Sequence, residues 1–168
     1  MSKILIISVT PNNNFVLAGN IKKVLDELGA EAEILNLHQY ALPVYTPETQ
    51  VLGTPNEAIE LAAKFKNAKS LIFCCPEYNG GIPPILVNAI AWISVSGDKD
   101  WRQGFNGKVT LITSHSSGMA AKMTFALQTQ LQHLGAVVLP RQIVTTSEKA
   151  FNEKSAKTIL GQLVKLSH

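Results

Sequence analysis

Five short apolar runs alternate along the chain with segments whose apolar residues recur at helical spacing. The first run, residues 4–9, is β-branched and uninterrupted, which is typical of a strand buried on both faces of a parallel sheet. Further runs begin near residues 31, 70, 108 and 136. Between the runs, apolar positions repeat every three or four residues, as at Leu17, Ile21, Val24, Leu25 and Leu28. The pattern predicts strands and helices in alternation.

This alternation predicts an α/β fold, because parallel strands need crossover helices that cover both faces of the sheet. Five strands favour the flavodoxin-like order 2-1-3-4-5 in a three-layer sandwich. No internal repeat or low-complexity segment is present, so we expect a single flavodoxin-like domain over residues 1–168. We expect strands at residues 4–9, 31–37, 70–75 and 108–113, a fifth strand beginning at 136–139, and a last helix over about 152–166.

Turn residues indicate how several of these elements begin and end. Residues 54–57 have the composition of a capping box with proline at the first helical position. Residues 40–51 are predicted to be a loop, because Pro43 and Pro47 oppose a helix. Residues 94–106 are predicted to form a polar loop that contains Trp101.

Composition and charge narrow the class of protein. The chain has 168 residues, 46% hydrophobic and 16% charged, and a formal net charge of +3. The lysines are scattered, so nucleic acid is not an expected partner. Neither a signal peptide nor an apolar stretch of about eighteen residues is present, so we expect no membrane contact and a cytoplasmic location. The adjacent Cys74 and Cys75 lack metal-site spacing and would form a strained disulfide, so we expect both to be buried and reduced.

Three loops are expected to meet outside the carboxyl ends of the strands, where open α/β sheets bind ligands. The first loop, residues 8–15, places Thr10 and three asparagines at a helix N-terminus, which suits an anion such as a phosphate. It lacks the glycine patterns of dinucleotide and P-loop sites. The alternative is that an asparagine simply caps the helix.

The second loop is a stiff turn that carries an aromatic ring and an amide: Pro76, Glu77, Tyr78, Asn79, Gly80, Gly81, Ile82, Pro83 and Pro84. Its glycines permit close approach of the backbone to a ligand, and its prolines set the entry to the next helix. It has no evident nucleophile, so it suits holding a planar cofactor. The alternative is a proline-stiffened turn with Tyr78 at the surface.

The third loop, residues 114–118, contains three serines, His115 and Gly118. A Ser/His pair suggests a hydrolase, but a nucleophile and its base are rarely adjacent and no G-x-S-x-G elbow is present. We therefore expect His115 to be a hydrogen-bond partner within the loop or a neighbour of the ligand. A Ser/His hydrolase is the less favoured alternative.

Together these loops resemble the NADPH-dependent FMN reductase family, and the resemblance covers almost the whole chain. It implies an FMN-dependent NAD(P)H oxidoreductase that takes hydride from NADPH or NADH. The acceptor would be a small molecule such as a quinone, an azo compound or a free flavin. The residues that carry the resemblance are 76–80, Ile82, Pro83, the Asn-Ala-x-x-Trp pattern from Asn88 to Trp92, residues 134–136 and Pro140.

The resemblance also implies a set of residues that hold FMN. These are Thr10, Asn12, Asn14, Phe15, Pro76, Glu77, Tyr78, Asn79, Gly80, Ser114, His115, Ser116 and Gly118. The flavin carries the chemistry, so neither a catalytic side chain nor a metal is expected. The family usually has an arginine where this chain has Asn12, and the loss of one charge-assisted contact predicts roughly ten- to a hundred-fold weaker FMN binding.

The resemblance further implies a homodimer or homotetramer, the typical state of the family, with subunit contacts expected near residues 85–94 and the Trp101 loop. Trp92 is alternatively an ordinary core residue. A second function class is a flavin-binding electron carrier or redox sensor with little NAD(P)H turnover. The altered first loop favours that class, whereas the mildly basic composition argues against it, since flavodoxins proper are usually acidic.

Overall fold

The computed structural model describes residues 3–97 and 100–167. Its centre is a sheet with the strand order β2-β1-β3-β4-β5, and a further strand, β6, pairs with β4. The described strand pairs are all parallel, and the predicted order is confirmed. The strands are β1 (Ile4–Ser8), β2 (Ala32–Asn36), β3 (Ser70–Cys74), β4 (Val109–His115), β5 (Val137–Val138) and β6 (Ile143–Thr145).

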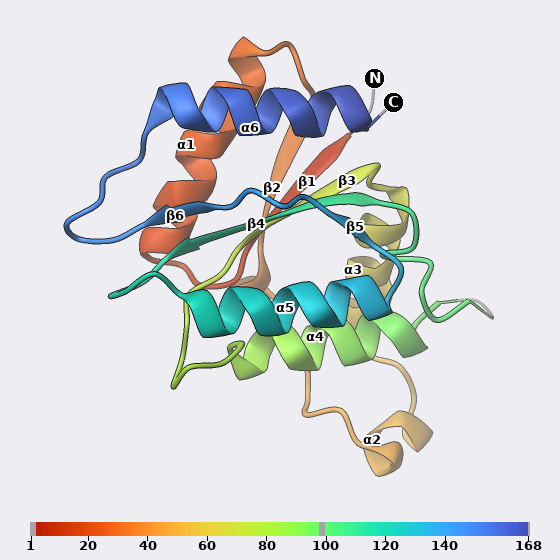
Figure 1. Cartoon of the computed structure of the whole chain (residues 1–168). Helices are drawn as coiled ribbons and strands as arrows, with labels where there is room; N and C mark the ends of the chain where they lie inside the picture. The colour runs from red at the N-terminus through yellow and green to blue at the C-terminus, as the bar shows by residue number, and fades with distance from the viewer. Residues whose placement is uncertain (1–2, 98–99, 168) are drawn as a thin grey trace.

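Helices cover both faces of the sheet, which confirms the three-layer sandwich (Figure 1). One face is covered by α1 (Asn13–Glu27) and α6 (Glu153–Leu166). The other is covered by α3 (Asn56–Asn67), α4 (Pro84–Val95) and α5 (Ala121–His133). Two short helices, η1 (Leu37–Gln39) and α2 (Pro47–Val51), belong to the connection that follows β2. Of these described helices, none has both the length and the apolar character needed to cross a lipid bilayer.

Alternate residues of the strands point into two separate apolar clusters. Leu5 and Ile7 of β1 pack with side chains of α3, α4 and α5, whereas Ile4 and Ile6 pack with those of α1 and α6. All four are buried. Burial of an apolar side chain of this size contributes about 1.5–3 kcal/mol. The two clusters therefore fix the helices on the sheet and, with them, the loops at its carboxyl edge.

The connection after β2 differs from the expected loop, because residues 47–51 form the helical turn α2. The Thr46 hydroxyl accepts a hydrogen bond from the Thr49 N–H at 3.1 Å, and the Thr46 N–H donates to Thr49 Oγ1 at 2.8 Å. Pro47 occupies the first helical position, where its missing N–H breaks no bond and its fixed φ suits a helix. This proline begins a helix rather than opposing one.

The capping box predicted at residues 54–57 is wrong. The helix α3 begins at Asn56, one residue later than that prediction requires, and extended Pro55 occupies the N-cap position. No side chain makes a capping hydrogen bond there. Because the helix starts late, Thr54 falls outside the position from which a hydroxyl reaches the first free N–H groups.

The predicted fifth strand is broken into two pieces that both pair with β4. The first piece, β5, pairs with Val109 and Thr110, and the second, β6, pairs with residues 113–115. Pro140 lies between them and has no N–H to contribute to a ladder. The pairing of β6 brings the residues that follow it to the carboxyl edge of the sheet.

A cluster of aromatic rings in the core gives a test of the packing. The ring centroid of Phe65 lies 6.2 Å from that of Phe73 and 5.5 Å from that of Phe105, and all three side chains are buried. Phe65→Ala is expected to lower the free energy of unfolding by about 3–5 kcal/mol, because it leaves a cavity in a close-packed core. The matched change Phe125→Ala, at a side chain 74% exposed on α5, is expected to cost under about 0.5 kcal/mol. Urea unfolding followed by circular dichroism measures both, and equal costs would contradict this packing.

Candidate functional site

The strands β1, β3 and β4 end at the same edge of the sheet, on the left of Figure 1, and the loops that follow them begin there. These loops surround a cavity of about 420 Å³. Its lining combines amides, hydroxyls, the Glu77 carboxylate and the rings of Tyr78 and His115. The described residues that line it are Thr10, Asn12, Asn13, Asn14, Pro76, Glu77, Tyr78, His115, Ser116, Ser117 and Ser147.

The structure brings most of the expected cofactor residues to this cavity. Those that line it are Thr10, Asn12, Asn14, Pro76, Glu77, Tyr78, His115 and Ser116. Those that stand outside the lining are Phe15, Asn79, Gly80, Ser114 and Gly118. The lining also includes Asn13, Ser117 and Ser147, which were not expected. Asn13 and Ser117 belong to loops that the sequence singled out, whereas Ser147 arrives after β6, a strand that no sequence pattern indicated.

Residues 78–81 form a tight hairpin turn. The Tyr78 N–H donates to the Gly81 carbonyl at 3.1 Å, and the Gly81 N–H donates to the Tyr78 carbonyl at 2.9 Å. The two central residues, Asn79 and Gly80, have φ values of 52° and 71°. Positive φ at both positions defines a type I′ turn, for which Asn-Gly is the preferred pair. The Asn-Gly pair therefore has a backbone reason to be present that is separate from contact with a ligand.

Glu77 joins the second loop to the third. Its N–H donates to the Ser116 hydroxyl at 2.8 Å, and its carboxylate accepts a hydrogen bond from the Met123 N–H at 3.0 Å. Met123 lies in the first turn of α5, where N–H groups have no partner within the helix and the helix dipole favours negative charge. The Glu77 carboxylate thus caps α5 and holds the serine loop against the turn.

Asn14 joins the first loop to the third. Its side-chain Nδ2 donates to the His115 carbonyl at 3.0 Å, and its Oδ1 accepts from the His115 N–H at 2.9 Å. The side chain is buried. Asn12 occupies the N-cap position of α1 but makes no side-chain capping bond. The simple N-cap alternative is therefore not what the asparagines do: the Asn14 amide bridges two loops, while the Asn12 side chain is exposed at the cavity.

The imidazole of His115 is oriented by β6 rather than by a serine. Its Nδ1 lies 3.0 Å from the Thr145 hydroxyl, which also donates to the Ser114 carbonyl at 3.3 Å. The hydroxyls of Ser114 and Ser116 lie 3.3 Å apart, and Ser114 is fully buried. A nucleophilic serine needs a base within hydrogen-bond reach of its hydroxyl. The hydrogen bonds of His115 and the two serines therefore favour a loop that shapes the cavity over a Ser/His hydrolase.

Cys74 ends β3 and Cys75 follows it, immediately before the second loop. Both are buried, and neither forms a disulfide. Burial raises the pKa of the Cys74 thiol to about 12, and burial with the neighbouring thiol raises the pKa of Cys75 as well. A thiol acts as a nucleophile or metal ligand only as the thiolate. Both therefore behave as neutral, packed groups near pH 7. Over residues 3–97 and 100–167, no cluster of His, Cys, Asp or Glu side chains is placed to hold a metal ion.

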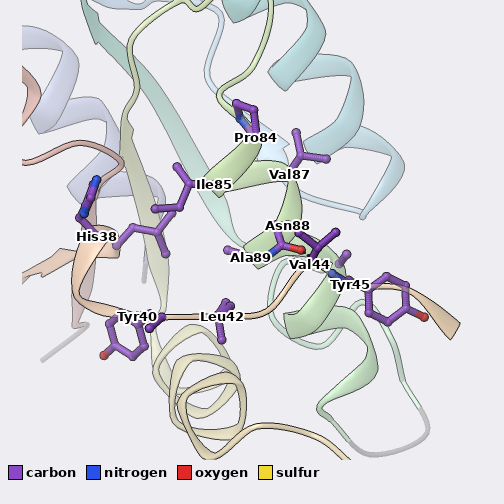
Figure 2. Close-up of a pocket in the computed structure, with 13 residues that line it drawn as sticks. His38, Tyr40, Leu42, Val44, Tyr45, Pro84, Ile85, Val87, Asn88 and Ala89 are labelled. Carbon is purple, nitrogen blue, oxygen red and sulfur yellow. Dashed lines mark hydrogen bonds between the residues drawn. The ribbon is translucent and has the colours of Figure 1, made fainter. Parts of the chain in front are cut away.

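A second and larger cavity, of about 740 Å³, lies between residues 37–45 and α4 (Figure 2). Apolar side chains such as Leu42, Val44 and Val87 line most of it. Binding sites for small polar ligands combine a cavity with convergent polar groups. Those groups converge in the smaller cavity, so the candidate site is there despite the size of the apolar groove.

Hydrogen bonds fix the segment from Pro43 to Tyr45 onto α4. The Asn88 amide donates to the Pro43 carbonyl at 3.0 Å and accepts from the Tyr45 N–H at 2.8 Å. The Trp92 indole N–H donates to the same Pro43 carbonyl at 2.7 Å. Trp92 is fully buried, so its interpretation as a core residue is confirmed.

Comparison with known proteins identifies the family. A family model described as NADPH-dependent FMN reductase matches residues 2–150. The chain belongs to the NADPH-dependent FMN reductase family. The matched region contains the three loops that build the polar cavity, so the cavity belongs to the part of the chain that defines family membership.

Curated relatives of this family member share about three residues in ten with it. An NAD(P)H-dependent FMN reductase of Pseudomonas aeruginosa is 29% identical over 115 residues, which cover 66% of this chain and 60% of the relative. A quinone reductase of Escherichia coli is 31% identical over 126 residues, which cover 72% of this chain and 65% of the relative. The chain thus spans just under two thirds of the length of these relatives.

Solved structures resemble this chain over nearly its whole length. The structure of FerB, a flavoenzyme NAD(P)H:(acceptor) oxidoreductase of Paracoccus denitrificans, matches with a TM-score of 0.76 at 20% identity. The match covers 99% of this chain and 96% of that one. At this identity the likeness shows the fold alone.

The bridge between Asn14 and His115 predicts a stability effect with a matched control. Asn14→Asp is expected to lower the free energy of unfolding by about 1–3 kcal/mol at pH 7, because an ionised carboxylate cannot donate to the His115 carbonyl. Asn13→Asp adds the same charge at an exposed site in the first turn of α1 and is expected to be neutral or slightly stabilising.

The effect of Asn14→Asp also depends on pH in a defined direction. A protonated carboxyl can donate again, and burial raises the pKa of the introduced carboxyl. The deficit relative to the parent protein is therefore expected to be small at low pH and to grow as pH rises through that pKa. Thermal unfolding at pH 4.5 and pH 8 measures this, and a deficit independent of pH would contradict the bridge.

Proposed function

We propose that the protein is an FMN-dependent NAD(P)H oxidoreductase that passes hydride through the flavin to a quinone, an azo compound or a free flavin. The observation that carries this proposal is that the family match over residues 2–150 includes the polar cavity at the carboxyl edge of the sheet. The names of the relatives, an NAD(P)H-dependent FMN reductase and a quinone reductase, support it. Either NADPH or NADH is the proposed donor.

In this proposal the protein positions the reactants, and FMN, when bound, supplies the hydride chemistry. We assign the ring of the flavin to the turn at residues 77–80 and its phosphate to the first turn of α1. The Tyr78 N–H is already bonded to the Gly81 carbonyl, so the N–H groups of Asn79 and Gly80 are the proposed donors to the polar edge of the ring. The free N–H groups at the start of α1 suit the phosphate. No side chain is assigned to proton transfer.

The Gly80 backbone provides a test of flavin binding with a closely matched control. Gly80 and Gly107 have φ values of 71° and 73°, so valine at either position is strained to a similar degree. Gly80→Val is expected to weaken FMN binding at least about tenfold, because it distorts the turn proposed to hold the ring. Gly107→Val is expected to leave FMN affinity unchanged. Titration followed by flavin fluorescence measures both affinities, and equal losses would argue against the assigned ring position.

Steady-state oxidation of NADPH and of NADH, with FMN and a quinone present, tests the activity itself. Turnover that requires FMN is the expected result. Flavin binding without turnover would instead favour the electron carrier or redox sensor. Esterase activity that is lost in Ser114→Ala or Ser116→Ala would revive the hydrolase alternative.

We further infer a homodimer or homotetramer in which the outer face of α4 contributes to the contact. The helix carries no charged residue, and Val87 on its outer face is 42% exposed beside the apolar groove of Figure 2. A helix that is apolar on its outer face usually has a partner. We also infer that residues 1–168 act as one domain in the cytoplasm. The packing of α6 on α1 supports the single domain. The two cysteines, which are not joined in a disulfide, support the cytoplasmic location.

Sedimentation velocity tests the proposed subunit contact. Val87→Arg is expected to shift the protein toward the monomer, because it places a charge in a desolvated interface. Val16→Arg makes the same change at an exposed site on the opposite face of the sheet and is expected to leave the assembly unchanged. A parent protein that sediments as a monomer would overturn the contact.

A further inference from the structure

The chain contains two Asn-Gly pairs, Asn79–Gly80 and Asn106–Gly107, which form an internal comparison. Each pair follows an aromatic residue, and both asparagines are exposed. The two glycines have nearly equal φ values of 71° and 73°. An asparagine before glycine is prone to lose its side-chain amide, because glycine has no Cβ to shield its backbone nitrogen from that side chain. The two pairs share this local chemistry, so a difference in their reactivity has to come from the fold.

The structure places the two glycine nitrogens in different surroundings. The Gly107 N–H donates to the Gly135 carbonyl at 2.9 Å. The Asn106 side chain lies against Gly135, where an added Cβ would overlap it. Among the described residues, by contrast, neither the Gly80 N–H nor the Asn79 amide has a hydrogen-bond partner. The nitrogen that would react is therefore held at the second pair and available at the first.

We propose that Asn79 is a modification site, which the fold leaves open to deamidation while it protects Asn106. In this reaction the Gly80 nitrogen gives up its proton and attacks Asn79 Cγ. The Cγ–Nδ2 bond breaks and releases ammonia, which leaves a cyclic imide. Water then opens the imide at one of its two carbonyls. The net reaction consumes one water and turns the amide into a carboxylic acid and ammonia, and nothing is oxidised or reduced.

The ease with which each segment opens favours the same site. Closure of the imide requires the carbonyl of Asn79 to rotate out of its turn position. The turn at residues 78–81 is held by two hydrogen bonds within its own tip. Gly107 is tied instead to Gly135, which is followed by the core residue Ala136. A local tip opens more readily than a segment anchored at a core.

The modification would change both the shape and the charge of the turn. Opening of the imide at Cγ gives aspartate, whereas opening at the backbone carbonyl gives isoaspartate, in which the main chain is one carbon longer. A two-residue type I′ turn does not accommodate the longer link, so the paired bonds between Tyr78 and Gly81 would be lost. Either product adds a negative charge two residues from Glu77. The modified turn is therefore expected to bind a flavin more weakly, a consequence that rests on the proposed function.

The first experiment compares the two sites within one sample of the full-length protein, freed of flavin. The protein is aged at mildly alkaline pH, and peptide mass spectrometry follows the deamidated fraction at each asparagine. Asn79 is expected to react at least about tenfold faster than Asn106, about the factor that one net hydrogen bond represents. In guanidinium chloride, which removes the fold, the two rates are expected to agree within about threefold. A native Asn79 that does not react, or a native ratio no larger than the unfolded one, would overturn the inference.

The variant Asn79→Gly provides a matched control. Gly-Gly also suits a type I′ turn, so this change removes the reactive amide and keeps the backbone. On ageing, the flavin affinity of the parent is expected to fall in proportion to the isoaspartate formed, whereas the affinity of Asn79→Gly is expected to stay at its starting value. An equal decline in both proteins would show that the loss does not arise at this turn.

Ageing with FMN present separates this inference from the proposed function. Bound FMN is expected to slow the reaction at Asn79 and to leave that at Asn106 unchanged, because the proposed ring position engages the Gly80 N–H. If FMN has no effect while flavin-free Asn79 still reacts faster than Asn106, the modification site stands and the assigned ring position is wrong. If flavin-free Asn79 does not react, the modification site is wrong and the proposed oxidoreductase stands.

Discussion

The β4–α5 loop is held on three sides by hydrogen bonds, and the shape of the polar cavity depends on them. Asn14 of α1 bonds both main-chain polar groups of His115, and Thr145 of β6 bonds its ring. Glu77 donates its N–H to Ser116 from the second loop. A loop free of such bonds would lose entropy each time it closed on a ligand. These contacts remove much of that cost beforehand, so the cavity is largely formed before a ligand arrives.

This cross-linking is possible because the sheet delivers the three loops to one place. The strands β1, β3 and β4 pair in register, so their carboxyl ends lie close together: Ser8 is opposite Cys74, and Cys74 is opposite Thr113, two residues before β4 ends. The apolar clusters on the two faces hold that register, since a shift by one residue would turn every buried side chain to the other face. The loops therefore inherit their positions from the core. They remain free to vary in chemistry, because few of their side chains belong to it.

The sequence was sufficient for the sheet order and for the three loops, because uninterrupted β-branched runs and helical spacing reflect burial directly. It was insufficient where the structure depends on pairing between distant segments. The strand β6 has only three residues, and no local pattern shows that it joins β4 beyond Pro140, so Ser147 could not be placed at the site. The bridge from Asn14 spans 101 residues, and composition cannot distinguish a ligand-binding amide from one that bonds the backbone. Pro47 misled for a local reason, since proline both ends helices and begins them.

The net charge of the chain does not describe the charge inside the polar cavity. Several cations form ion pairs elsewhere: Lys64 with Glu33 at 2.9 Å, Lys22 with Asp26 at 2.8 Å, and Lys157 with Glu27 at 3.1 Å. At physiological salt, charges more than about 8 Å apart are largely screened. A net charge of +3 therefore says little about the field inside the cavity, which the local amides, hydroxyls and helix end determine. Because Asn12 is exposed and lies outside both apolar clusters, the residue at this position sets the charge of the site at almost no cost to the fold.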